Sequence, residues 1–206
     1  MQAGTRVHEY ARESVARHKS LAAKDPSNAK GTLFTKLADA GDKGLSEHET
    51  CSEARGYIVA GSDTTAVTLT YLVYAVCQDS RIRDKLVSEL ISLPDNLTDR
   101  HARNLPYLNQ VINETLRLYT AVPGVLPRVV PEEGAQLAGF NLPRGTIVST
   151  QAYSMHRDPN IFPDPLTFNP ERWASPTKAM KDASLPFGGG SRSEYLAKLT
   201  KSVNRS

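Results

Sequence analysis

Four short segments hold most of the residues in this chain that could do chemistry. The first is AGSDTT, Ala60–Thr65, in which the acid Asp63 precedes the alcohol Thr64. An acid beside an alcohol can pass a proton along. Gly, Ser, Asp and Thr are also poor residues for a helix interior, because their side chains compete for backbone hydrogen bonds. We therefore expect a helix to loosen at Gly61, and a kink that packs against a neighbouring element is the alternative interpretation.

Two further segments carry charges that could pair. Glu114 and Arg117 in ETLR are three residues apart, so they share a helix face and can form an ion pair. This match alone is weak, because Glu9 and Arg12 show the same spacing. Arg172 in the later segment FNPERW could join the pair, since two guanidinium groups can share one carboxylate.

The fourth segment is the glycine-rich stretch LPFGGGSR, residues 185–192. Three glycines permit positive φ angles and a close approach of the backbone to a flat ligand, and Arg192 could meet an anion. Two other functions are excluded by what is missing. The HRD tripeptide at 156–158 also occurs in kinase catalytic loops, but Pro163 stands where that motif requires Asn. No Lys-Ser or Lys-Thr follows the glycines, as a phosphate-binding loop requires.

Helices interrupted by Pro- and Gly-rich segments are predicted to position these residues. A capping box formed by Ser46 and Glu49 starts a long helix that runs to Cys77, a length of ~48 Å. Its second half is apolar nearly all round, which is typical of a helix buried in a large protein. Further helices are expected over residues 4–23, 32–40, 80–93 and 106–120. Strands are expected at 125–130, 135–140 and 146–155, and a long ordered loop over 156–193.

Composition narrows the possible classes of function. The 206 residues carry a net charge of +3 with scattered basic side chains, which excludes a nucleic-acid partner. No secretory signal opens the chain, and no window holds 18 consecutive apolar residues. Cys51 and Cys77 match no metal motif and are expected to be free thiols. The fold class is mainly α with a small β-sheet.

Taken in order, AGSDTT, ETLR, PERW and PFGGGSR resemble the cytochrome P-450 family, the heme-thiolate monooxygenases. The texture is closest to eukaryotic microsomal members, and a filamentous fungus is the expected source. The stretch HRDPNIFPDPLTFNPERW resembles that family's approach to its heme loop. The resemblance covers residues 1–193, about the C-terminal half of a full-length member, and leaves 194–206 as a tail outside the family. It implies a partial cytochrome P-450 fold with a long central helix, a Glu-x-x-Arg helix, short hairpins and a heme-loop region.

The resemblance implies roles for residues on the long helix and on the helix after it. Asp63 and Thr64 match the acid–alcohol pair that helps to deliver protons to bound dioxygen. Ala60 and Gly61 match the positions where this helix passes over the distal heme face. The structural triad that locks the heme loop corresponds to Glu114, Arg117 and Arg172.

Further cofactor and substrate positions follow from the same resemblance. Arg128 and Arg192 match the arginines that bind the heme propionates. Phe187 and Gly188 match positions of the loop that lies against heme. The segment 122–126 matches one that commonly lines the substrate pocket.

The pattern breaks at the iron ligand. The family's loop reads Phe-x-x-Gly-x-Arg-x-Cys-x-Gly, and its Cys thiolate binds the iron of heme b. Counting from Phe187, that position is Glu194, and the following Gly is Leu196. A thiolate pushes electron density to iron and favours O–O cleavage, whereas a carboxylate is a hard and weakly donating ligand. Cys51 and Cys77 are expected on the distal-side helix, so no metal ligand is predicted in this chain.

Three hypotheses about function follow. The favoured one is an inactive product of a monooxygenase gene, because the sequence departs abruptly after Ser193, as a frameshift, a retained intron or a gene-model error would produce. The second is an active heme monooxygenase that takes electrons from NADPH-cytochrome P-450 reductase and oxidises a small lipophilic substrate, as in secondary metabolism. The third is a heme-free binding or decoy module. Family members are anchored in the endoplasmic reticulum membrane, but this chain shows no anchor or signal and is expected in the cytoplasm, with poor stability in isolation.

Overall fold

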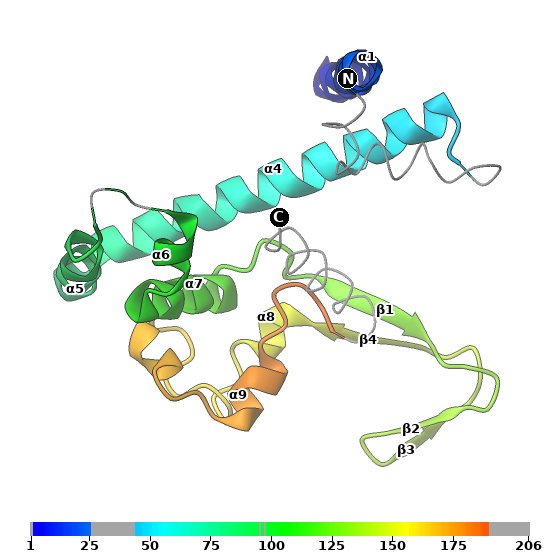
Figure 1. The fold of residues 1–206 in the computed structure, drawn as a ribbon. Helices are drawn as coiled ribbons and strands as arrows, with labels where there is room; N and C mark the ends of the chain where they lie inside the picture. Colours follow the sequence, from blue (N-terminus) through cyan, green and yellow to red (C-terminus); the bar gives the residue numbers. More distant parts are fainter. Residues whose placement is uncertain (1, 26–43, 95, 97, 190–206) are drawn as a thin grey trace. The chain divides into compact units, whose positions relative to one another are not determined.

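The structure of the chain is a computed structural model that describes residues 2–25, 44–94, 96 and 98–189 (Figure 1). The chain forms two compact units, residues 1–66 and 67–206. The helix expected over 32–40, the residues Arg192 and Glu194, and the tail 194–206 lie outside the described residues.

The first unit contains α1 (Gln2–Lys24) and the first part of α4 (Glu47–Gln78). Its core consists of four buried residues from the two helices, with Ile58 packed against them: Ala11, Val15, Cys51 and Ala54. The predicted capping box is confirmed, because the Ser46 N–H donates to Glu49 Oε2 at 2.9 Å and the Glu49 N–H donates to Ser46 Oγ at 3.3 Å. Two backbone donors that the helix leaves unpaired are satisfied in this way.

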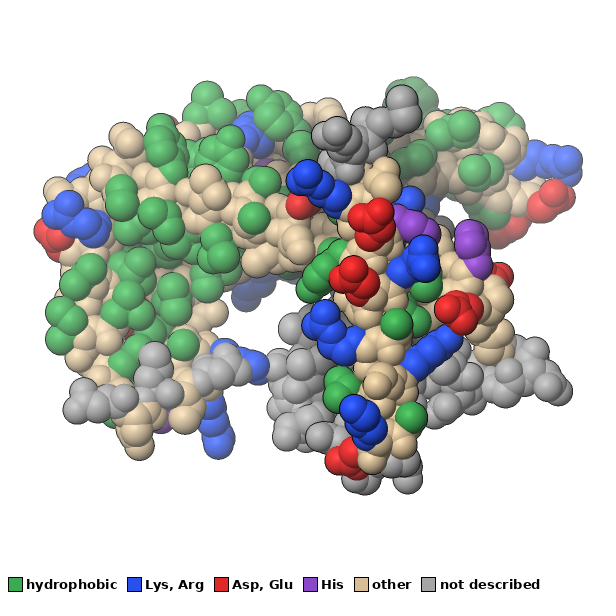
Figure 2. All heavy atoms as spheres, turned by 90° about the horizontal axis from the view of Figure 1, so that it is seen from above, with side chains coloured by type: hydrophobic (Ala, Val, Ile, Leu, Met, Phe, Trp, Pro, Cys, Tyr) green, Lys and Arg blue, Asp and Glu red, His purple; other side chains and the backbone are tan. Residues whose placement is uncertain are grey.

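From its capping box, α4 runs without a break through residues 60–65 and on to Gln78. The loosening expected at Gly61 is therefore absent. Much of the apolar second half is exposed: 55% of Leu69, 58% of Val73 and 52% of Tyr74 are accessible. Figure 2 shows hydrophobic side chains over much of the face in view.

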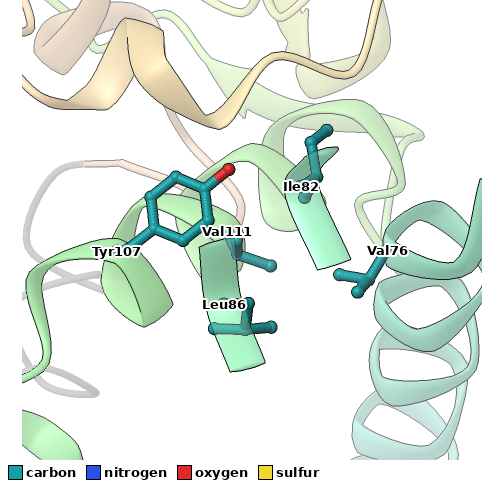
Figure 3. Close-up of a cluster of buried hydrophobic side chains, with 5 residues drawn as sticks. All are labelled: Val76, Ile82, Leu86, Tyr107 and Val111. Atoms are coloured by element: carbon teal, nitrogen blue, oxygen red, sulfur yellow. The ribbon is translucent and has the colours of Figure 1, made fainter. Parts of the chain in front are cut away.

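Three helices build the main core of the second unit: α5 (Ser80–Ile91), α6 (Asp99–Arg103) and α7 (Pro106–Leu118). Buried side chains from the end of α4, from α5 and from α7 meet there, as Figure 3 shows: Val76, Ile82, Leu86, Tyr107 and Val111. The α7 N-terminus is capped from α5, because Glu89 accepts hydrogen bonds from the backbone N–H groups of Tyr107 and Leu108, both at 2.8 Å. Pro106 occupies the first turn, as predicted.

Two small antiparallel sheets follow α7. Strands β1 (Val125–Val129) and β4 (Ile147–Gln151) pair with Val125 opposite Gln151 and Val129 opposite Ile147. Strands β2 (Ala135–Leu137) and β3 (Phe140–Leu142) form a hairpin. Its two turn residues, Ala138 and Gly139, have φ angles of 49° and 84°. Positive φ at both central residues suits the right-handed twist of a hairpin.

Short helices interrupt the segment expected to be strand and loop. The predicted strand over 146–155 ends at Gln151 and continues as α8 (Ala152–Met155). The expected loop contains η2 (Pro170–Trp173), capped by Asn169, and α9 (Lys178–Ala183), capped by Thr177. A buried cluster under α9 explains why these turns are stable: Phe162, Met180 and Ala183. The predicted fold class, mainly α with a small sheet, is confirmed. No helix among the described residues is long and apolar enough to span a bilayer.

Candidate functional site

A buried ion pair lies at the centre of the second unit. On α7 the Arg117 Nε donates to Glu114 Oε2 at 2.9 Å and the Arg117 Nη2 donates to Glu114 Oε1 at 2.8 Å. Both side chains are 0% exposed. The spacing of three residues brings the two groups together on one helix face, as the sequence predicts. A bidentate pair of this kind fixes both the position and the plane of the guanidinium group.

Groups far along the chain converge on the same carboxylate. Arg172 Nε donates to Glu114 Oε1 at 3.0 Å, so the predicted third member joins the pair. Trp173 Nε1 donates to Oε2 at 2.8 Å, and the Asn169 backbone N–H donates to Oε1 at 2.9 Å. We call these groups together the Glu114 network. Through it, α7 holds η2 and the segment before it.

Arg117 uses all five of its N–H groups. Besides Glu114, it donates to three backbone carbonyl groups: His156 O at 2.6 Å, Pro165 O at 2.8 Å and Thr167 O at 3.3 Å. A guanidinium group has five donors in a fixed planar arrangement, so none is left unsatisfied in this buried position. Arg117 therefore fixes the path of the segment between α8 and η2.

His156 is buried next to Arg117 and is 0% exposed. Its Nδ1 lies 2.9 Å from Arg117 O, and its Nε2 accepts a hydrogen bond from the Leu185 backbone N–H at 2.8 Å. Burial lowers the pKa of His156, and the positive charges of Arg117 and Arg157 lower it further, whereas the hydrogen bond to Arg117 O opposes this shift. The ring is therefore held neutral at physiological pH.

The glycine loop begins directly after this contact. Gly188 has a φ of 76°, and a Cβ at this position would lie 3.3 Å from Leu126 Cδ1 on β1. A side chain here would strain the backbone and crowd Leu126. Phe187 is 64% exposed. The structure thus places Phe187 and Gly188 beside β1, whereas Arg192, predicted in the same loop, lies outside the described residues.

Arg128 lies on β1 with an exposed guanidinium group that donates to the Pro127 carbonyl at 2.8 Å. Val125 and Val129 on the same strand are 60% and 67% exposed. The strand therefore presents a cation among apolar side chains, but no contact joins Arg128 to the Glu114 network within the described residues.

The four predicted residues of α4 belong to the first unit. Thr64 Oγ1 donates to the Ala60 carbonyl at 2.6 Å, one turn earlier in the helix. Asp63 is exposed, and a Cβ at Gly61 would meet nothing within 4 Å. The acid and the alcohol are adjacent on the helix, but no hydrogen bond joins them in the described part of the chain.

The two cysteines lie on α4, as predicted. Cys51 is buried in the core of the first unit against α1, and Cys77 is exposed near the end of the helix. Among the described residues, no three His, Cys, Asp or Glu side chains are grouped so that they could hold a metal ion.

A second polar cluster, which the sequence did not reveal, ties α5 and α7 to η2. Glu171 accepts hydrogen bonds from Lys85 Nζ at 3.1 Å and from Tyr107 Oη at 3.2 Å. Burial, together with the negative charge of Glu171, raises the pKa of Tyr107 to about 12. Trp173 and His156 were also missed as members of the site. The only local signal for Trp173 was its place in PERW, next to the predicted Arg172.

Comparison with known proteins gives the family. A model described as Cytochrome P-450 matches residues 1–193. The cytochrome P-450 monooxygenase orf2 of Aspergillus niger is 52% identical over 89% of this chain, and tazI of Aspergillus terreus is 52% identical over 93%. The chain spans 37% and 40% of the lengths of these relatives. Both relatives are fungal, in agreement with the expected source.

A solved structure agrees with the sequence relatives. The retinoic acid-bound cyanobacterial CYP120A1 superposes with a TM-score of 0.71 and 32% identity, over 88% of this chain and 43% of that one. The fold and the family model thus point the same way. The chain belongs to the cytochrome P-450 family, as the order of its four motifs predicted.

Proposed function

We propose that residues 1–193 are the part of a fungal cytochrome P-450 monooxygenase that carries the Glu114 network and the heme loop. The whole enzyme would oxidise a small lipophilic substrate, in secondary metabolism, with electrons from NADPH-cytochrome P-450 reductase. The tail 194–206 would lie outside the family domain. We further propose that the chain, with Glu194 at the ligand position, does not form a thiolate-ligated heme centre.

One observation carries the first part of this proposal. Glu114 gathers Arg117, Arg172, Trp173 and the Asn169 amide in a site where the side chains of Glu114 and Arg117 are fully buried. Burying three ionic groups is costly unless each is paired and hydrogen-bonded, as they are here. Such an arrangement suits a structural role, because it leaves no group free to react with a substrate.

The remaining residue roles belong to the same proposal. Asp63 and Thr64 would form a proton path beside the substrate pocket, with Ala60 and Gly61 leaving room over the heme face. Arg128 and Arg192 would bind the propionates, whose charge their guanidinium groups complement. Phe187, Gly188 and the segment 122–126 would line the sites for cofactor and substrate.

The donor set does not fit a thiolate-ligated heme. Cys51 is packed in the core of the first unit, and Cys77 lies on α4, outside the glycine loop. Both ring nitrogens of His156 are already engaged, so this residue is not a free ligand. A Glu at position 194 supplies a hard oxygen donor in place of sulfur. On these grounds we propose that the chain as written lacks monooxygenase chemistry.

Sequencing the transcript across the codon for Ser193 tests the second part of the proposal. We expect the continuation Glu194-Tyr195-Leu196 in the mature message. A Cys-x-Gly continuation, from another frame or exon, would show that the protein made in the cell carries the ligand, and the active monooxygenase would then replace our proposal.

A further inference from the structure

His156 joins two segments that lie 29 residues apart on one side and 39 on the other. Its ring reaches Arg117 O, near the C-terminal end of α7, and the Leu185 N–H, where the glycine loop begins. The link to α7 is reciprocal, because Arg117 Nη1 donates to the His156 carbonyl at 2.6 Å. The backbone of His156 is fixed as well, since its N–H donates to Ala152 O at 2.8 Å.

The two contacts permit only one form of the ring. A carbonyl oxygen can only accept, so Nδ1 must carry the proton that it shares with Arg117 O. A backbone N–H can only donate, so Nε2 must be unprotonated to accept from Leu185. The Nε2–H tautomer would turn both contacts into mismatched pairs, and the doubly protonated ring would lose the contact to Leu185. Since the ring is 0% exposed, bulk water cannot replace a lost partner.

We propose that His156 is a positioning residue, a latch that holds Leu185 and the start of the glycine loop against α7 in the neutral Nδ1–H form. Its action passes through Arg117, so the latch connects the loop to the Glu114 network. The segment on the Leu185 side adds no competing charge, because residues 184–189 are Ser, Leu, Pro, Phe and two Gly. The proposal concerns the chain's own hydrogen bonds and does not depend on heme binding or on the proposed function.

The tautomer of His156 is the first test. Histidine-selective ¹⁵N labelling of the full chain, read by long-range ¹H–¹⁵N correlation at neutral pH, distinguishes the two neutral forms. We expect a protonated Nδ1 and an unprotonated Nε2 for His156, assigned by the signal that His156→Gln removes. His101 is an internal reference of the opposite kind, because its Nδ1 accepts from the Thr98 N–H at 3.1 Å. A His156 ring in the Nε2–H form, or one averaging rapidly between forms, would overturn the proposal.

Hydrogen exchange at the Leu185 amide is the second test. In His156→Phe, which fills the space without hydrogen bonds, the protection of this amide should fall about 10- to 100-fold, because a buried donor loses its acceptor. His156→Gln should retain part of the protection, since its amide oxygen can take the place of Nε2. His156→Asn is too short to reach Leu185 and should behave like the Phe variant.

Two controls separate the latch from a general loss of structure. The Ser184 N–H, bound to Met180 O at 3.1 Å, should keep its protection in all three variants. His101→Phe should leave the Leu185 amide unchanged. Equal protection of Leu185 in the wild type and in His156→Phe would refute the latch. If the Phe variant does not fold, the tautomer of the wild-type ring still decides the question.

Discussion

Glu114 is the single acceptor for donors from three parts of the chain. Arg117 comes from its own helix, Arg172 and Trp173 from η2, and the Asn169 amide from the segment before it. Because the carboxylate is the only anion bound to two buried guanidinium groups, its charge matters more than its size. Removing one partner of a buried ion pair leaves an uncompensated charge in a medium that solvates it poorly.

We therefore expect Glu114→Gln to destabilise the chain by about 3–5 kcal/mol, with the loss coming from the charge because the side chain keeps its shape. The midpoint of urea unfolding measures this change. Glu132→Gln is the matched control, since Glu132 and its partner Arg144 are 85% and 70% exposed. That exposed pair should contribute less than about 1 kcal/mol. Similar effects of the two substitutions would contradict the structural role of Glu114.

His156 gives the chain a predicted dependence of stability on pH. Burial, with the charges of Arg117 and Arg157, lowers the pKa of His156 in the folded chain below its ordinary value of 6.5. A lowered pKa means that the stabilising contribution is complete above pH 6.5 and is lost as the pH falls through the folded-state pKa. The free energy of unfolding should therefore fall between neutral and mildly acid pH. In His156→Gln this component should be missing, and equal pH profiles for the two proteins would contradict the assignment.

At the scale of elements, local signals in the sequence were enough for the long helices. The Ser46–Glu49 capping box and Pro106 placed the starts of α4 and α7, because a cap satisfies backbone donors within a few residues. The ion pair of Glu114 and Arg117 was readable for the same reason. Short helices such as α8 and α9 were missed, since a helix of one or two turns is stabilised by packing that local sequence does not show.

Contacts between distant segments were the other limit. His156 binds groups 29 and 39 residues away, and Trp173 reaches Glu114 across 59 residues. No periodicity connects such positions, because the intervening segment is irregular. Arg172 could be predicted only because the PERW motif was read together with ETLR. Residue patterns thus found the charged triad but not the groups that complete its hydrogen bonding.

The cap that α5 provides to α7 leads to a prediction for these elements. Leu105, at the N-cap position of α7, makes no side-chain cap, and Glu89 supplies both acceptors instead. Glu89→Ala should therefore cost about 1–2 kcal/mol, the upper part of the range for a lost cap. Glu53→Ala on the exposed side of α4 is the control and should change stability by less than about 0.5 kcal/mol. Equal urea midpoints for the two variants would mean that Glu89 does not cap α7.

For the whole molecule, the apolar side chains at the surface of α4 are the dominant feature. Leu69, Val73 and Tyr74 are each more than half exposed. Contiguous apolar surface of this kind drives association in water. The purified chain should therefore bind a hydrophobic dye and associate as its concentration rises, as dye fluorescence and sedimentation velocity would show.

Replacing Leu69 and Val73 together by Gln should reduce both signals. Phe140→Gln, at an exposed position in the β2–β3 hairpin, should have a smaller effect. A monomer with little dye binding and one sharp thermal transition would contradict this expectation and the predicted poor stability.

The central claim is that this member of the cytochrome P-450 family does not offer a thiolate to heme. The most direct measurement is the absorption spectrum of the full chain after incubation with heme, reduction and exposure to carbon monoxide. We predict no red-shifted Soret band, and the same result for Glu194→Cys alone, because Leu196 still replaces the Gly that follows the ligand. A red-shifted Soret band in the unaltered chain, the signature of a thiolate-ligated heme, would contradict the claim.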